Sequence, residues 1–196
     1  WRPTAEKVRS VLNALENDLP LPPPRYPEPE TYIGDASVLQ HRSAVVVGPF
    51  GSGCTRMINE ARREWFASGY RSISGRCNPI TPFGAVVEIL ESLFKPYSPE
   101  MCRTIAGPQA AILRAIAPNL PLPSEQTEDW PIEIPRLAVA IAQVLHRIKP
   151  IALIFYEVQL ADPGTSTLLS LLNEAIPNEV YIWCCSRTQM PWGQHV

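Results

Sequence analysis

A glycine-rich segment in the first quarter of the chain contains the residue types that bind phosphate. It reads Val45-Val46-Val47-Gly48-Pro49-Phe50-Gly51-Ser52-Gly53-Cys54-Thr55-Arg56 and begins with an apolar run typical of a buried strand. Its glycines allow the backbone to curl, so that successive N–H groups can point at one anion. The spacing fits the phosphate-binding loop Gly-x-x-x-x-Gly-Lys-Ser/Thr at every defined position but one. Cys54 stands where that pattern has its lysine.

The helix expected after this loop, over about residues 55–68, adds the positive end of its dipole to the same place. The residues expected to bind nucleotide here are Gly48, Gly51, Ser52, Gly53, Cys54 and Thr55. Thr55 is also the candidate hydroxyl ligand for magnesium. Three arginines of the helix, Arg56, Arg62 and Arg63, fit a solvated face better than phosphate contacts.

The cysteine has two opposed interpretations. As a passive replacement it removes the cation that faces the β- and γ-phosphates. A hydrogen bond to a charged group is worth roughly 1.5–3 kcal/mol, so nucleotide binding is expected to be about ten- to hundred-fold weaker. As a thiol at a helix N-terminus, Cys54 is instead expected to react faster than the other four cysteines.

A phosphate loop needs a partner strand that brings carboxylates to magnesium and to the attacking water. The apolar run Ile151-Ala152-Leu153-Ile154-Phe155 has the form of such a strand. Tyr156 occupies the first acid position after it, and Glu157 occupies the second. Glu157 is therefore the candidate catalytic residue. The alternative is a solvated acid at a strand end.

The surrounding pattern alternates strands with helices. Strands are expected over residues 43–47, 70–74, 151–156 and 180–185, and helices over 55–68, 82–96, 131–149 and 165–176, with a proline-broken helical region over 99–131. This alternation predicts an α/β fold, a three-layer sandwich with a parallel sheet.

Composition limits the functional classes. The chain has 196 residues, 45% of them hydrophobic, with a formal net charge of -2. That charge favours neither nucleic acid nor a membrane surface as a partner, and no apolar run approaches the roughly 18 residues of a membrane span. Five cysteines without paired spacing predict free thiols in a reducing, cytoplasmic compartment.

Three regions are expected along the chain. Residues 1–18 predict an amphipathic helix, residues 19–31 a proline-rich linker, and residues 32–196 the nucleotide-binding-type domain. The chain contains 22 prolines, and those of the linker favour a stiff polyproline spacer. The alternative use of such a segment is as a ligand for a proline-recognising domain.

Several segments resemble the AAA/STAND-type regulatory ATPases. Their acidic strand end is similar to the run Phe155-Tyr156-Glu157-Val158-Gln159-Leu160-Ala161-Asp162-Pro163. Another recurring stretch of the family resembles Gly75-Arg76-Cys77 followed by Pro82-Phe83-Gly84. Val180–Cys185 followed by Ser186-Arg187 resembles their sensor strand, with Arg187 in the arginine position. The resemblance covers about residues 32–190. It implies a P-loop NTPase-like fold, ATP or ADP with magnesium as ligands, and Arg187 as a nucleotide-binding residue.

The first helix carries a second resemblance. Trp1-Arg2-Pro3-Thr4-Ala5-Glu6-Lys7-Val8, continuing to Leu15, is similar to the last helix of protein kinase domains. It implies that residues 1–18 are a kinase remnant, and the alternative is an ordinary amphipathic helix. The kinase catalytic residues themselves are absent from the sequence.

Departures from the ATPase family decide the expected function. Loss of the lysine at Cys54 and of the aspartate at Tyr156 predicts a degenerate regulatory or interaction module of a larger intracellular signalling protein, with protein partners or neighbouring domains, weak or absent nucleotide binding and little hydrolysis. One alternative is a working ATPase that uses Thr55, Glu157 and Arg187. Another is a scaffold that joins a kinase to further domains and never binds nucleotide. The family's fifth strand and helical lid domain are expected to be absent or to lie outside the chain.

Overall fold

The computed structural model describes residues 43–123 and 133–188. The predicted amphipathic helix of residues 1–18 and the predicted linker of residues 19–31 lie outside the described residues. Within the described ranges, no helix has the length and apolarity needed to cross a bilayer.

Four strands form one sheet. They are β1 (Ser43–Val47), β2 (Arg71–Arg76), β3 (Ile151–Tyr156) and β4 (Val180–Ser186), in the order β1-β4-β3-β2. Every neighbouring pair is parallel, as the alternation of strands and helices predicts. All four strands therefore end at the same edge of the sheet, where ligands of open α/β sheets bind.

The helices connect these strands. They are α2 (Cys54–Ala67), α3 (Gly84–Phe94), α4 (Pro99–Ala106), α5 (Ala110–Ile116), α6 (Ile134–Ile148) and α7 (Pro163–Ala175), with short 3-10 turns η2 (Gly107–Gln109) and η3 (Val158–Leu160). The expected helices over 82–96 and 131–149 are shorter at both ends, and the strand expected over 70–74 extends two residues further. The proline-broken region resolves into α4, η2 and α5.

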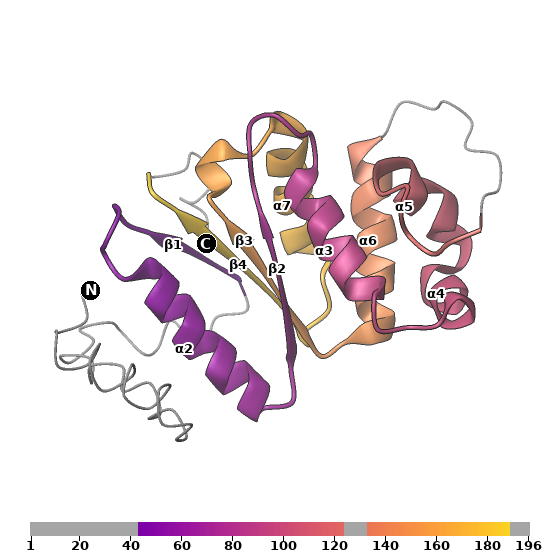
Figure 1. The fold of residues 1–196 in the computed structure, drawn as a ribbon, viewed down its shortest axis with the longest axis horizontal. Helices are drawn as coiled ribbons and strands as arrows, with labels where there is room; N and C mark the ends of the chain where they lie inside the picture. Colours follow the sequence, from indigo (N-terminus) through magenta and orange to yellow (C-terminus); the bar gives the residue numbers. More distant parts are fainter. Residues whose placement is uncertain (1–42, 124–132, 189–196) are drawn as a thin grey trace, which may run out of the picture. The chain divides into compact units, whose positions relative to one another are not determined.

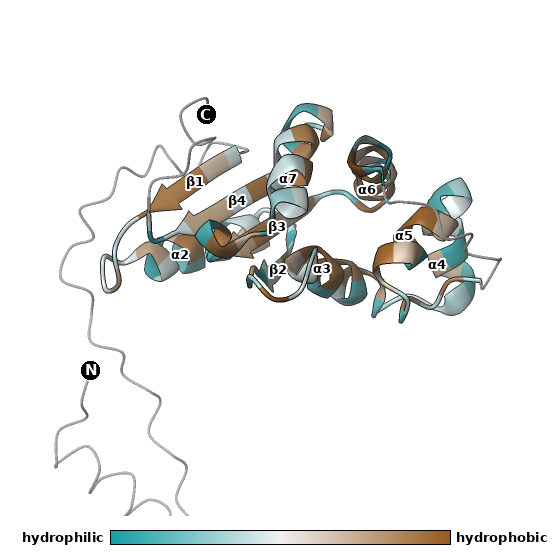
Figure 2. Ribbon diagram, turned by 90° about the horizontal axis from the view of Figure 1, so that it is seen from above, coloured by the Kyte–Doolittle hydropathy of each residue, from teal (hydrophilic) through white to brown (hydrophobic). Residues whose placement is uncertain are grey.

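The sheet is the middle layer of a three-layer sandwich. On one face, the buried side chains of α2 pack on alternate residues of the strands. Together they form the smaller of two hydrophobic clusters in the described residues, and this cluster consists of Ala44, Val46, Ile58, Ala61, Trp65, Ala152, Ile154 and Trp183. The intervening strand residues face the larger core under α3, α6 and α7. Figure 1 shows α2 on one side of the strands and these three helices on the other. In Figure 2, β1 and β3 are largely brown, as expected for strands covered on both faces.

Close packing at Gly75 fixes α3 against β2. A Cβ atom added at Gly75 would lie 2.2 Å from the carbonyl oxygen of Ala85, in the first turn of α3. Only glycine allows the helix backbone to approach the strand this closely. This contact positions the end of β2, and with it Arg76, at the edge of the sheet where the other strands end.

Candidate functional site

The glycine-rich loop connects β1 to α2 at this edge. The N–H of Gly48 donates to the carbonyl of Ser186 at the end of β4 (3.0 Å), which ties the start of the loop to the neighbouring strand. Gly51 and Gly53 have φ angles of 87° and 92°, a conformation that other residues rarely adopt. The first turn of α2 contains no acidic residue, so its N–H groups and dipole remain available to an anion.

A pocket of about 470 Å³ opens above the loop and the ends of all four strands. Its lining residues are Gly48, Pro49, Phe50, Gly51, Ser52, Gly53, Cys54, Thr55, Arg56, Arg76, Tyr156, Glu157, Cys185 and Arg187. The structure thus brings together the residues that the sequence singles out in the loop, after β3 and after β4. Their roles in binding and catalysis stay predictions.

Glu157 lies at the centre of an ion-pair network. One of its carboxylate oxygens accepts a hydrogen bond from the Arg187 guanidinium and lies 3.6 Å from a guanidinium nitrogen of Arg76. Arg187 also stacks over the ring of Phe50, 5.7 Å from its centroid. The Glu157 side chain is only 19% exposed, and its backbone has a φ of 56°. This carboxylate can orient a water only after it leaves its contacts with the two arginines.

Two arginines that the sequence does not assign to the site, Arg56 and Arg76, also line the pocket. Sequence alone predicts no role for Arg76, which is noted only within the segment Gly75-Arg76-Cys77 that resembles the ATPase family. Arg76 reaches the pocket because β2 pairs with β3. For Arg56, the choice between a phosphate contact and a solvated helix face stays a prediction. The helix-face prediction fits Arg63, which is 74% exposed and pairs with Glu60, whereas Arg62 donates to Ser72.

Cys54 is the first residue of α2 and is half-buried. Its sulfur lies 3.2 Å from the hydroxyl oxygen of Ser52 and 3.9 Å from the carbonyl oxygen of Gly48. The side chain therefore packs back over the loop, where the lysine of an ordinary phosphate loop would extend toward the phosphates. It contributes no positive charge there.

The residues present fit a phosphate better than a magnesium ion. The loop and the arginines offer N–H donors and positive charge, which suit phosphate oxygens. For magnesium, the pocket offers the Thr55 hydroxyl, whereas the strand-end position that would supply a carboxylate is Tyr156. Within residues 43–123 and 133–188, no group of three or more His, Cys, Asp or Glu side chains is placed to hold a metal ion.

Asp162 has a structural task just beyond the pocket. Its carboxylate accepts hydrogen bonds from the N–H and hydroxyl of Thr165 (3.0 and 2.5 Å) and from the N–H of Phe83 (3.0 Å). Burial alone would raise the pKa of Asp162, but these hydrogen bonds outweigh it and lower the pKa below its ordinary value. Asp162 thereby caps α7 and anchors the segment before α3 to it.

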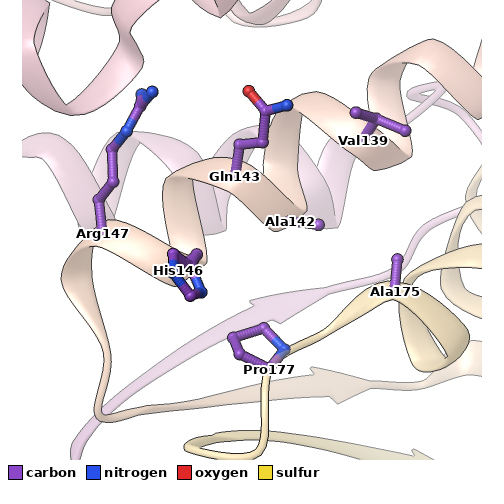
Figure 3. Close-up of a pocket in the computed structure, with 7 residues that line it drawn as sticks. All are labelled: Val139, Ala142, Gln143, His146, Arg147, Ala175 and Pro177. Atoms are coloured by element: carbon purple, nitrogen blue, oxygen red, sulfur yellow. The ribbon is translucent and has the colours of Figure 1, made fainter.

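A second hollow, of about 510 Å³, lies between α6 and the segment that ends α7 (Figure 3). Its lining residues are Val139, Ala142, Gln143, His146, Arg147, Ala175 and Pro177. It contains no glycine loop and no helix N-terminus, and the guanidinium of Arg147 donates to the carbonyl of Ile105. The pocket above the loop is therefore the candidate functional site.

Comparison with known proteins agrees with this geometry. The family model described as the AAA ATPase domain matches residues 32–183, which include the loop, β3 and most of β4. No curated protein and no solved structure matches the chain. The family match covers well over half of the chain, and the parallel sheet with its glycine loop is the fold that such a domain requires. The chain belongs to the AAA ATPase domain family.

Proposed function

We propose that this domain is a regulatory or interaction module of a larger signalling protein, which binds nucleotide phosphates weakly and hydrolyses them little. The observation that carries the proposal is the composition of the pocket. The glycine cradle is complete, whereas cysteine and tyrosine occupy the positions of the lysine and the metal-binding aspartate, and Glu157 is paired with arginines.

Weak phosphate binding follows from the donors that remain. The loop N–H groups and the N-terminus of α2 supply partial positive charge. Arg76 and Arg187 supply two full charges at the mouth of the pocket. Both are shared with Glu157, so an incoming phosphate must compete with this carboxylate for them. Affinity is therefore lower than the number of cations suggests.

Poor hydrolysis follows from the groups that are replaced. Phosphoryl transfer depends on positioned cations that neutralise charge on the transferred group. Tyr156 cannot hold magnesium as an aspartate does, and Cys54 cannot neutralise the phosphates. Glu157 would have to leave both arginines to orient an attacking water.

A regulatory domain needs two conformations of the loop and the strand ends, one with phosphate bound and one without it. In the structure, Arg187 joins the end of β4 to Glu157 and to Phe50 of the loop. A phosphate in the cradle would draw Arg187 away from Glu157 and loosen this link. We propose that neighbouring domains or protein partners read this change in the strand ends and the loop.

Calorimetry with ATP and ADP, with and without magnesium, tests the proposal. We expect dissociation constants in the high micromolar to millimolar range, with little gain from magnesium. Arg187→Gln should weaken binding further, whereas Arg103→Gln on the distant helix α4 should leave it unchanged. No binding at millimolar nucleotide would refute the proposal and favour a scaffold. Micromolar binding that is strengthened by magnesium would also refute the proposal and would favour a working ATPase.

The second candidate is a working ATPase with a non-standard loop. Its specific support is the pair of arginines at the pocket mouth, which could replace the charge of the missing lysine. Steady-state ATP turnover distinguishes the two. A working enzyme requires measurable turnover that falls at least about tenfold in Glu157→Gln, as expected when a general base is lost. The regulatory module requires turnover near background in both proteins.

A further inference from the structure

Two of the five cysteines lie together in the pocket. Cys54 begins α2, and Cys185 lies one residue before the end of β4, beside Val46 of β1 in the sheet register. Both line the pocket above the loop, and both pack against the hydrophobic cluster under α2. The neighbouring Cys184 points to the opposite face of the sheet, into the larger core.

Backbone contacts bring the two thiols to the same place. The Cys54 sulfur lies 3.9 Å from the carbonyl oxygen of Gly48, and the N–H of Gly48 donates to the carbonyl of Ser186, the residue after Cys185. Burial and the nearby Cys54 raise the pKa of Cys185 to about 11. Cys185 is therefore protonated at neutral pH. Both sulfurs line the pocket that a reagent would enter.

The other three cysteines are not placed for such chemistry. Cys77, Cys102 and Cys184 are each no more than 3% exposed. Burial raises the pKa of Cys77 to about 12 and also raises that of Cys184. The Cys102 thiol donates to the carbonyls of Phe94 and Tyr97, both at 3.6 Å. A reagent in water thus reaches these sulfurs only when the core opens.

We propose that Cys54 and Cys185 form a reversible redox site, closed by a disulfide between the first turn of α2 and the end of β4. With hydrogen peroxide as the oxidant, the Cys54 sulfur attacks one peroxide oxygen and becomes a sulfenic acid, and one water leaves. The Cys185 sulfur then attacks the Cys54 sulfur, and the hydroxyl departs with the Cys185 proton as a second water. In total, two thiols and one peroxide give one disulfide and two waters. A dithiol reductant reverses the reaction by thiol–disulfide exchange.

The bond would act on the phosphate site, and this consequence rests on the proposed function. Cys54 lies within the cradle, because it begins α2 and its sulfur contacts the hydroxyl of Ser52. A covalent link to Cys185 holds the first turn of α2 against β4 and removes the freedom of the loop to close around a phosphate. Oxidation is therefore expected to lower phosphate affinity.

Mass spectrometry of the folded full chain, before and after hydrogen peroxide treatment, tests the bond. We expect the loss of two hydrogen atoms from the monomer, with Cys54 linked to Cys185 by fragmentation of the joined peptides, and full reversal by dithiothreitol. Cys54→Ser and Cys185→Ser should each abolish the bond, whereas Cys102→Ser, which retains a donor at a buried site, should form it as the wild type does. A persistent sulfenic or sulfinic acid at Cys54, a different pairing, or a link only between chains would overturn the proposal.

Nucleotide calorimetry on the reduced and oxidised proteins separates the two hypotheses. An intramolecular Cys54–Cys185 bond with no nucleotide binding by the reduced protein supports the redox site and refutes the proposed function. Binding by the reduced protein that falls at least fivefold on oxidation, and returns with dithiothreitol, supports both. Unchanged affinity after complete oxidation would overturn the proposed control of the phosphate site.

Discussion

Replacing Cys54 with lysine tests directly whether the missing cation limits nucleotide binding. Cys54 is the first residue of α2, and its side chain lines the pocket together with the loop N–H groups. A lysine at this position needs no change in the loop glycines, because they already have the required left-handed conformation. Its ammonium group would extend into a pocket of about 470 Å³ and reach phosphate oxygens there.

The expected magnitude follows from one added charge-assisted hydrogen bond. Such a bond is worth roughly 1.5–3 kcal/mol, and each 1.4 kcal/mol is about a tenfold change in a dissociation constant. Cys54→Lys should therefore bind ATP and ADP about ten- to hundred-fold more tightly than the wild type. Arg76 and Arg187 at the pocket mouth repel the new cation, which places the expected gain toward the lower end.

The assay is calorimetric titration of ATP and ADP, with thermal unfolding to establish that the variants are folded. Cys54→Met is the matched control, since it adds length without charge. The gain in Cys54→Lys should shrink at high salt, because it depends on charge. Equal affinity of the lysine and methionine variants, in proteins with equal melting temperatures, would refute the view that the loop is a phosphate cradle lacking only its cation. Turnover should stay low in Cys54→Lys, since Tyr156 still replaces the aspartate.

Three further predictions concern residues around the site. Glu157→Gln should strengthen ADP binding by about two- to fivefold in calorimetry, because it releases the arginines from pairs worth about 0.2–1 kcal/mol each; weaker binding would contradict this reasoning. Asp162→Asn should lower the free energy of unfolding at pH 7 by about 1–2 kcal/mol in urea titrations, because a neutral amide replaces the charged acceptor of the hydrogen bonds from Thr165 and Phe83. The pKa of Asp162 is lowered in the folded protein, so the ionised carboxylate contributes its full stability above the unfolded pKa of about 3.9. That stability is lost as pH falls through the lower folded pKa, and the wild type and Asp162→Asn should then become equally stable in acid. A stability difference that persists at pH 2 would contradict this role of the carboxylate. Gly75→Ala should destabilise the fold by about 1–3 kcal/mol, because its Cβ meets the Ala85 carbonyl, whereas Ser74→Ala on the same strand should change stability far less, and equal effects would argue against the close contact.

Most of the fold could be predicted from the sequence. The apolar runs at β1 and β3 have the lengths of buried strands, and their predicted bounds, 43–47 and 151–156, agree with the structure. The loop was recognisable because its glycines perform a local task, turning the chain within a few residues. Helix ends were less predictable: residues 82–83 stay outside α3 because Phe83 has a φ of 55° and its N–H is bound by Asp162.

The contacts within the pocket were less accessible to sequence reasoning. Arg76 is far along the chain from Glu157, and they meet because β2 pairs with β3 in a register that aligns Arg76 with Tyr156. The Cys54–Cys185 pair depends on β4 lying beside β1, a strand order that periodicity does not reveal. The ion pair of Glu157 with Arg187 likewise joins residues thirty positions apart. A sequence pattern indicates that each residue lies at the sheet edge, but it gives no distance between them.

The sequence by itself determined the chemistry that is present and missing: a glycine cradle, a cysteine for the lysine, a tyrosine for the aspartate and a remaining glutamate. These are properties of residue type and local spacing, which the fold does not alter. The tertiary structure decided what those groups do to one another. It placed two arginines on the glutamate and a second thiol beside the first, because parallel strands bring the ends of distant segments to one edge of the sheet.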